Sequence, residues 1–80
     1  MYSVTVYTKP NCPQCRMTYL KLGKEGIEYT SVDVTENAQA LMFITEELGY
    51  SQAPVVVVDQ DIENHWSGFR PDRIESLAKK

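Results

Sequence analysis

Two cysteines separated by two residues are the part of this sequence with the clearest chemistry. Cys12 and Cys15 are the only cysteines of the 80-residue chain, and they flank Pro13 and Gln14. Thiols at this spacing can form a disulfide with each other, exchange it with another disulfide, or supply two ligands to a metal ion. The elements that carry the two thiols decide among these chemistries.

The residues around the pair predict that Cys12 opens a helix. An alternating strand pattern ends just before Lys9, and Pro13 is favoured at the first position of a helix. Unpaired N–H groups and the helix dipole stabilise an anion at that end, so we expect a lowered pKa and more thiolate at Cys12. Lys9 adds positive charge nearby, and Cys15, one turn further on, is predicted to be more buried.

This placement gives each thiol its own role, which we state as a hypothesis. Cys12 attacks a disulfide in the substrate and forms a mixed disulfide. Cys15 then attacks Cys12, which releases the reduced substrate and leaves an internal disulfide. The sequence shows no obvious buried carboxylate that would accept the proton of Cys15.

Three other uses of the two cysteines compete with this hypothesis. A purely structural disulfide is the poorer explanation for a protein of a reducing compartment. A closed zinc site needs four ligands, and only His65 is available beyond the cysteines, at a spacing unlike that of a zinc finger. We expect His65 to be a structural residue of an edge strand. A metal ion or iron–sulfur cluster shared between two chains stays open as an alternative.

Composition excludes several classes of protein. The net charge is −3, from 11 acidic and 8 basic residues, which argues against a nucleic-acid partner. The longest apolar run, Ala53–Val58, is far too short to span a membrane, and no apolar leader is visible. We therefore expect one domain over residues 1–80, a cytoplasmic location, and a monomer.

Hydrophobic periodicity predicts four strands and three helices. The strands are expected at Tyr2–Tyr7, Ile27–Val34, Val55–Val58 and Ile62–Ser67. The first helix runs from Cys12 or Pro13 to the glycines at 23 and 26, with Met17 and Leu20 on one face and Lys21 and Lys24 in water. The second helix is capped by Thr35 or Asn37 and closed by Gly49, with an apolar face of Ala38, Leu41, Met42, Thr45 and Leu48. The third opens at Pro71 and turns Ile74 and Leu77 inward.

This element order, β-α-β-α-β-β-α, predicts an α/β fold. A strand–helix–strand unit implies a parallel pair with a right-handed crossover, and two strands joined by a short polar turn imply an antiparallel hairpin. The four-valine run suits a strand buried on both faces. The expected architecture is a mixed four-stranded sheet flanked by three helices.

Three segments carry a resemblance to a known family. Residues 4–15, which end at Cys15, resemble the opening of glutaredoxins and of the wider thioredoxin-fold class. Residues 51–56 and, above all, the segment from Trp66 to Asp72 look like the NrdH-redoxin family. Members of that family are glutaredoxin-like proteins that behave like thioredoxins and donate electrons to ribonucleotide reductase.

The resemblance implies a fold and a set of site residues. It implies the thioredoxin/glutaredoxin fold, a cis peptide bond before Pro54, and an Ala53 backbone that pairs with an incoming extended peptide. It also implies that Ser67, Gly68 and Phe69 line a cleft beside Cys12. The residues expected to contact a partner or substrate are Lys9, Pro13, Gln14, Ala53, Pro54, Ser67, Gly68 and Phe69.

The resemblance further implies an electron path. The chain would reduce class Ib ribonucleotide reductase and would be re-reduced by thioredoxin reductase, a flavoprotein that uses NADPH, with no cofactor held by this chain. A glutathione-dependent glutaredoxin is the alternative. Glutaredoxins that use glutathione have a Gly-Gly turn followed by small polar and acidic residues where this chain has Ser67-Gly68-Phe69, although Lys9 is retained.

Overall fold

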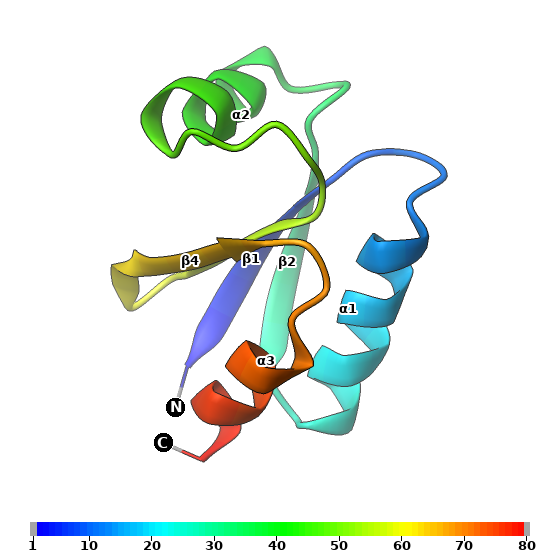
Figure 1. Ribbon diagram of the computed structural model, residues 1–80, viewed down its shortest axis with the longest axis vertical. Coiled ribbons are helices and arrows are strands. Elements are labelled where there is room, and N and C mark those ends of the chain that lie inside the picture. The colour runs from blue at the N-terminus through cyan, green and yellow to red at the C-terminus, as the bar shows by residue number, and fades with distance from the viewer. Residues whose placement is uncertain (1, 80) are drawn as a thin grey trace.

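Residues 2–79, which a computed structural model describes, form a mixed four-stranded sheet with helices on both of its faces (Figure 1). The elements in chain order are β1 (Ser3–Thr8), α1 (Pro13–Lys24), β2 (Glu28–Asp33), α2 (Ala38–Met42), η1 (Phe43–Glu47), β3 (Val55–Val58), β4 (Asp61–Ser67) and α3 (Pro71–Ala78). The predicted order of strands and helices is confirmed, and the observed strand ends lie within one residue of the predicted ones.

The strands lie in the order β2-β1-β3-β4. β1 pairs with β2 in parallel, and α1 forms the crossover between them. β3 runs antiparallel to β1, with Val56 opposite Val6, and antiparallel to β4, with Val56 opposite Trp66. The predicted parallel pair and antiparallel hairpin are both present, so β1 and β3 are the central strands.

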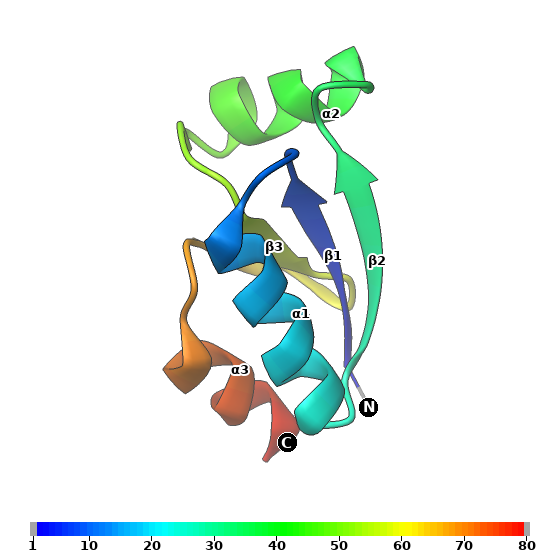
Figure 2. The ribbon, with the colours of Figure 1, turned by 90° about the vertical axis from the view of Figure 1, so that its right-hand side faces the viewer.

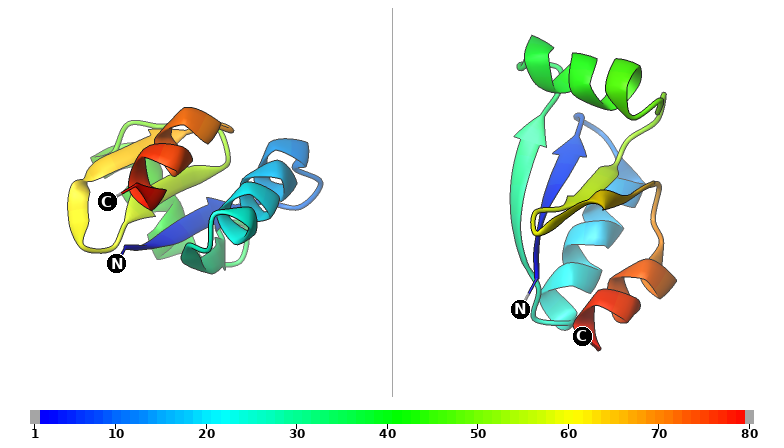
Figure 3. Two further views of the ribbon diagram at one scale, coloured as in Figure 1. Left: turned by 90° about the horizontal axis from the view of Figure 1, so that it is seen from below. Right: turned by 90° about the vertical axis from the view of Figure 1, so that its left-hand side faces the viewer.

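The central strand β3 is buried on both faces, as its four valines predict. Val56 and Val58 pack on the side of α1 and α3, in a core with Val4, Val6, Leu22, Ile27, Trp66, Ile74 and Leu77. Val55 and Val57 pack on the side of α2, with Val34, Ala40 and Ile44. Figures 2 and 3 show α1 and α3 side by side, with α2 set apart from them. The inward orientation predicted for Ile74 and Leu77 is confirmed.

The face predicted for α1 is wrong. Met17 and Leu20, expected on the apolar face, are 49% and 70% exposed, whereas Cys15, Thr18 and Leu22 are buried. The buried positions follow an i, i+3, i+7 spacing that starts at the second cysteine, which is the helical repeat of one face. Because Thr18 is polar, a pattern built on apolar residues alone chooses the wrong stripe.

The second helical segment differs from its prediction in face and in regularity. Asn37 caps it as predicted, since its Oδ1 accepts a hydrogen bond of 3.0 Å from the N–H of Ala40. After Met42 the chain continues as the π-helical turn η1. Ala40 and Ile44 are buried, while Leu41 and Met42 are exposed, so the predicted apolar face is wrong here too.

The two lysines of α1 that were predicted to face water differ in their environments. Lys24 is exposed as expected, but Lys21 is half-buried and forms ion pairs with Glu25 and Glu75 instead of facing water.

Over residues 2–79, none of the helices combines the length and the apolar character that a membrane-spanning segment requires.

Candidate redox site

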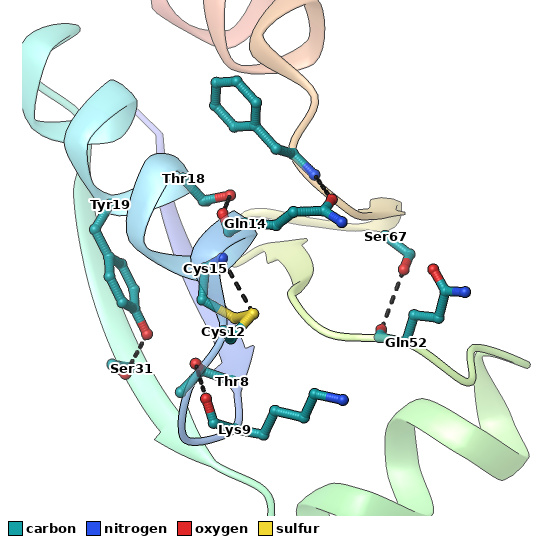
Figure 4. Close-up of a disulfide and its surroundings, with 11 residues drawn as sticks. Thr8, Lys9, Cys12, Gln14, Cys15, Thr18, Tyr19, Ser31, Gln52 and Ser67 are labelled. Carbon is teal, nitrogen blue, oxygen red and sulfur yellow. Dashed lines mark hydrogen bonds between the residues drawn. A yellow bond between two sulfur atoms is a disulfide. The ribbon is translucent and has the colours of Figure 1, made fainter.

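Cys12 and Cys15 are joined by a disulfide at the start of α1 (Figure 4). Cys12 is the N-cap residue, with an extended backbone, and Pro13 occupies the first turn. The loop from β1 turns at Asn11, whose φ of 58° lies in the left-handed region that asparagine tolerates better than most residues. The predicted helix start is confirmed, and it places Cys12 at the positive end of the helix dipole.

The two sulfurs occupy different environments. Cys12 is half-buried, whereas Cys15 is 2% exposed. The backbone N–H of Cys15 donates a hydrogen bond of 3.2 Å to Sγ of Cys12. When the disulfide is reduced, this donor and the helix dipole stabilise a thiolate at Cys12, because both favour negative charge there. The accessible sulfur is therefore the one that the helix start activates.

A cleft of about 380 Å³ opens beside Cys12. Its lining residues are Lys9, Asn11, Cys12, Pro13, Gln14, Gln52 and Ala53. Five of these seven are predicted from the sequence, and Asn11 and Gln52 are not. Asn11 could be found from the sequence, because asparagine is one of the few residues other than glycine that adopt a left-handed backbone. It therefore indicates the turn that leads into Cys12. Lys9 is the only charged residue of the lining and places a positive charge at the cleft.

The wall opposite α1 is formed by the turn that precedes β3. The peptide bond from Ala53 to Pro54 is cis, and Pro54 is buried behind the lining. Ala53 is half-buried. Among the described residues, the backbone N–H and C=O of Ala53 have no hydrogen-bond partner. These two groups are free for strand-like pairing with an extended chain, which is the arrangement that the predicted role of Ala53 requires.

Ser67, Gly68 and Phe69 adjoin the cleft without forming its lining. We call these residues the 67–69 segment. Ser67 Oγ donates a hydrogen bond of 3.2 Å to the carbonyl of Gln52, and the N–H of Gly68 donates one of 2.8 Å to the carbonyl of Pro54. The segment thus contacts Gln52 and Pro54 in the turn before β3, and its expected contact with a partner stays a prediction.

His65, Arg70 and Trp66 have contacts within the fold, although Nε1 of Trp66 is buried without a hydrogen-bond partner among the described residues. His65 is half-buried, and its Nδ1 lies 2.7 Å from the hydroxyl of Tyr50, which agrees with a structural role. Arg70 pairs with Asp72 at 2.9 Å, at the start of α3. Trp66 is buried in the core, with the guanidinium of Arg73 5.1 Å from its ring centroid.

A closed zinc site within one chain needs further ligands beside the two cysteines. Over residues 2–79, no three side chains of histidine, cysteine, aspartate or glutamate gather in one place.

The buried polar residue on the same face of α1 as Cys15 is Thr18, whose hydroxyl donates to the carbonyl of Gln14 at 2.8 Å. A threonine hydroxyl is not a base, so Thr18 does not accept the proton of Cys15.

Comparisons with known proteins agree with this geometry. The family model described as Glutaredoxin matches residues 4–63. The gene 56 protein of Mycobacterium phage L5 is 39% identical over 74 residues, which cover 92% of this chain and 70% of the phage protein. The glutaredoxin-like protein NrdH of Salmonella typhimurium is 37% identical over 75 residues, covering 94% of this chain and 88% of that protein.

A solved structure shares the whole arrangement of elements. NrdH-redoxin from Escherichia coli, a glutaredoxin-like protein with a thioredoxin-like activity profile, superimposes with a TM-score of 0.83 at 32% identity. The match covers 94% of this chain and 93% of that protein. The fold class predicted from the sequence is therefore confirmed.

Proposed function

The chain belongs to the glutaredoxin family and, within it, to the NrdH glutaredoxin-like proteins, and from that premise we propose that it reduces protein disulfides through Cys12 and Cys15. The observation that carries this proposal is the asymmetry of the pair. Cys12 caps α1 and opens into the cleft, whereas Cys15 is buried one turn behind it and already bonded to it.

The asymmetry supports a two-step exchange. In the reduced protein, the thiolate of Cys12 attacks one sulfur of the substrate disulfide, and the other substrate sulfur leaves as a thiolate that takes up a proton. The thiolate of Cys15 then attacks Sγ of Cys12, and the second substrate sulfur leaves and is protonated. Two electrons pass to the substrate, and the Cys12–Cys15 disulfide remains in the protein.

We propose class Ib ribonucleotide reductase as the substrate and thioredoxin reductase, with its flavin and NADPH, as the source of electrons. The resemblance to NrdH-redoxins is the ground for ribonucleotide reductase, and the thioredoxin-like activity profile of the E. coli protein supports thioredoxin reductase. The exchange needs no cofactor in this chain. We propose a monomer, since each turnover requires release from the partner. We propose a cytoplasmic location, since the cycle requires a reducing compartment.

One experiment can test the proposed electron source separately from the exchange at Cys12 and Cys15. The purified protein is supplied with NADPH and thioredoxin reductase, or with NADPH, glutathione and glutathione reductase, and disulfide reduction is followed as loss of NADPH absorbance. We expect turnover only with thioredoxin reductase, because the 67–69 segment replaces the residues that glutaredoxins use for glutathione.

Each alternative has its own outcome. Turnover only with glutathione would remove thioredoxin reductase as the donor and make the chain a glutaredoxin, with the exchange at Cys12 and Cys15 unchanged. No turnover with either donor, together with metal bound at one ion per two chains and lost when either cysteine is replaced, would favour the shared metal site.

A further inference from the structure

The side chain of Gln14 crosses from α1 to the 67–69 segment (Figure 4). Its Oε1 accepts a hydrogen bond of 3.0 Å from the N–H of Phe69. Because a backbone N–H is only a donor, the amide group must present its oxygen to Phe69. Gln14 therefore lines the cleft and, through the same side chain, is attached to a segment 55 residues away in sequence.

The same segment is attached to the opposite wall of the cleft. Ser67 donates to the carbonyl of Gln52, which lines the cleft, and Gly68 donates to the carbonyl of Pro54, directly behind Ala53. The 67–69 segment thus links the wall that carries the cysteines to the wall that carries Ala53. Two of these three links run through a side chain, that of Ser67 and that of Gln14. The Gln14 link is the one that reaches α1, and a single substitution can remove it.

We propose that Gln14 is a positioning residue that fixes the distance between the two walls of the cleft for a protein disulfide. This inference rests on the proposed function, because it concerns the same site. An extended substrate chain that pairs with the backbone of Ala53 must present its disulfide to Cys12 at the same time. The gap between Ala53 and the start of α1 decides whether both contacts form together.

The local geometry suits glutamine at this position. Gly68 has a φ of +83°, and a Cβ added to it would lie 3.2 Å from Oε1 of Gln14, so the glycine leaves room for the amide. The side chain must be long enough to reach Phe69 and must end in an acceptor. Glutamate meets both conditions, whereas methionine has the length but only a weak acceptor sulfur.

A small disulfide substrate distinguishes the proposed positioning role of Gln14 from a general structural role. Bis(2-hydroxyethyl) disulfide reaches Cys12 without spanning the two walls, whereas a disulfide within insulin is flanked by peptide chain. Loss of the Gln14 link should therefore lower the rate constant for insulin more than that for the small disulfide. General damage to α1 would lower both rate constants together.

The test compares the parent protein with Gln14→Met, Gln14→Glu and the matched control Arg16→Met, which changes an exposed residue of the same helix. Each protein is reduced chemically, freed of reductant, and mixed with insulin or with bis(2-hydroxyethyl) disulfide in single turnover. This design needs no reductase, so an error in the proposed electron source cannot affect it. Amide hydrogen exchange of the Phe69 N–H reports the link directly.

We expect Gln14→Met to lower the ratio of the insulin rate constant to the small-disulfide rate constant about five-fold, the factor that corresponds to one hydrogen bond of about 1 kcal/mol. The Phe69 N–H should exchange faster in Gln14→Met and stay protected in Gln14→Glu. An unchanged ratio in Gln14→Met, an equal fall in Arg16→Met, or an unprotected Phe69 N–H in Gln14→Glu would overturn the inference. Failure of the parent to reduce either disulfide would instead refute the proposed function.

Discussion

The backbone N–H of Cys15 points at the sulfur of Cys12, 3.2 Å away, so each cysteine contributes to the chemistry of the other. Cys15 supplies a donor through its backbone and a thiol through its side chain. Since the donor belongs to the backbone, it survives replacement of the Cys15 side chain. The two contributions can therefore be separated by mutation.

This separation predicts opposite outcomes for the two serine variants. Cys12→Ser should abolish disulfide reduction, because the attacking thiolate is gone. Cys15→Ser keeps the donor to Cys12 and should form a mixed disulfide with insulin that persists, since no second thiol resolves it. Mass spectrometry under non-reducing conditions measures the adduct.

The double variant, in which both cysteines are serine, is the control for adducts that do not involve Cys12. A Cys12→Ser protein that still reduced insulin at the parent rate would contradict the assignment of the attacking sulfur. Rapid release of insulin from Cys15→Ser would contradict the assignment of the resolving sulfur.

The face of α1 gives a prediction about stability. Leu22 is fully buried, whereas Leu20, two positions earlier, is 70% exposed. Leu22→Ala should lower the free energy of unfolding by about 2–5 kcal/mol, a large share of what a small domain has. Leu20→Ala should change it by less than about 0.5 kcal/mol. Urea unfolding of both variants measures the difference, and equal losses would show that the assigned face is incorrect.

These two leucines also show how far the sequence alone leads. The strands could be predicted because their signals are local: alternation in β1, and four valines in β3 that only a strand buried on both faces accommodates. The start of α1 could be predicted from Pro13 and Cys12. The faces of α1 and α2 could not, because the exposed apolar side chains of Met17, Leu20 and Leu41 obscure the helical repeat of the buried positions.

The residues of the candidate site also fall into those that the sequence predicts and those that it does not. Cys12, Cys15 and Lys9 stand close together in sequence, so their proximity follows from one loop and one helical turn. The contact of Gln14 with Phe69 depends on where the loop between β4 and α3 lies relative to α1 and cannot be deduced from spacing. Gln52 was missed for a similar reason, since its place in the cleft is set by the turn before β3.

The ion pairs between α1 and α3 predict a dependence of stability on pH. Lys21 Nζ lies 2.7 Å from Glu75 and 3.1 Å from Glu25. Its hydrogen bond with Glu75 lowers the pKa of that carboxyl below its ordinary 4.5, and its hydrogen bonds with Glu75 and Glu25 raise the pKa of Lys21 above its ordinary 10.5. Glu75 therefore stabilises the fold above pH 4.5 and loses this effect as the pH falls through its lowered pKa.

Lys21 has the opposite sign, since its stabilisation is complete below pH 10.5 and is lost as the pH rises through its raised pKa. Lys21→Met should therefore be less stable than the parent at neutral pH, and the difference should disappear in acid. Urea unfolding across this range measures it. Lys24→Met is the control, because Lys24 is exposed and has no ion pair among residues 2–79. A difference that persisted in acid would point to lost packing of the lysine stem instead.

Gly68 and Gly49 form a matched pair for testing the environment of the 67–69 segment. Both have a left-handed backbone, with φ values of +83° and +80°. An alanine in this region costs about 1–2 kcal/mol. A Cβ at Gly49 would meet nothing within 4 Å, whereas a Cβ at Gly68 would meet Oε1 of Gln14 at 3.2 Å.

Gly49→Ala and Gly68→Ala should therefore lose stability by similar amounts, because the end of a flexible side chain can move away from the new methyl group. Only Gly68→Ala should displace the amide of Gln14, and the Phe69 N–H, deprived of its acceptor, should then exchange faster with solvent. Urea unfolding measures the shared backbone cost, and amide exchange measures the displacement. Equal exchange at Phe69 in both variants would mean that Gln14 accommodates the methyl group without giving up its hydrogen bond, so the contact between Gly68 and Gln14 would not require glycine.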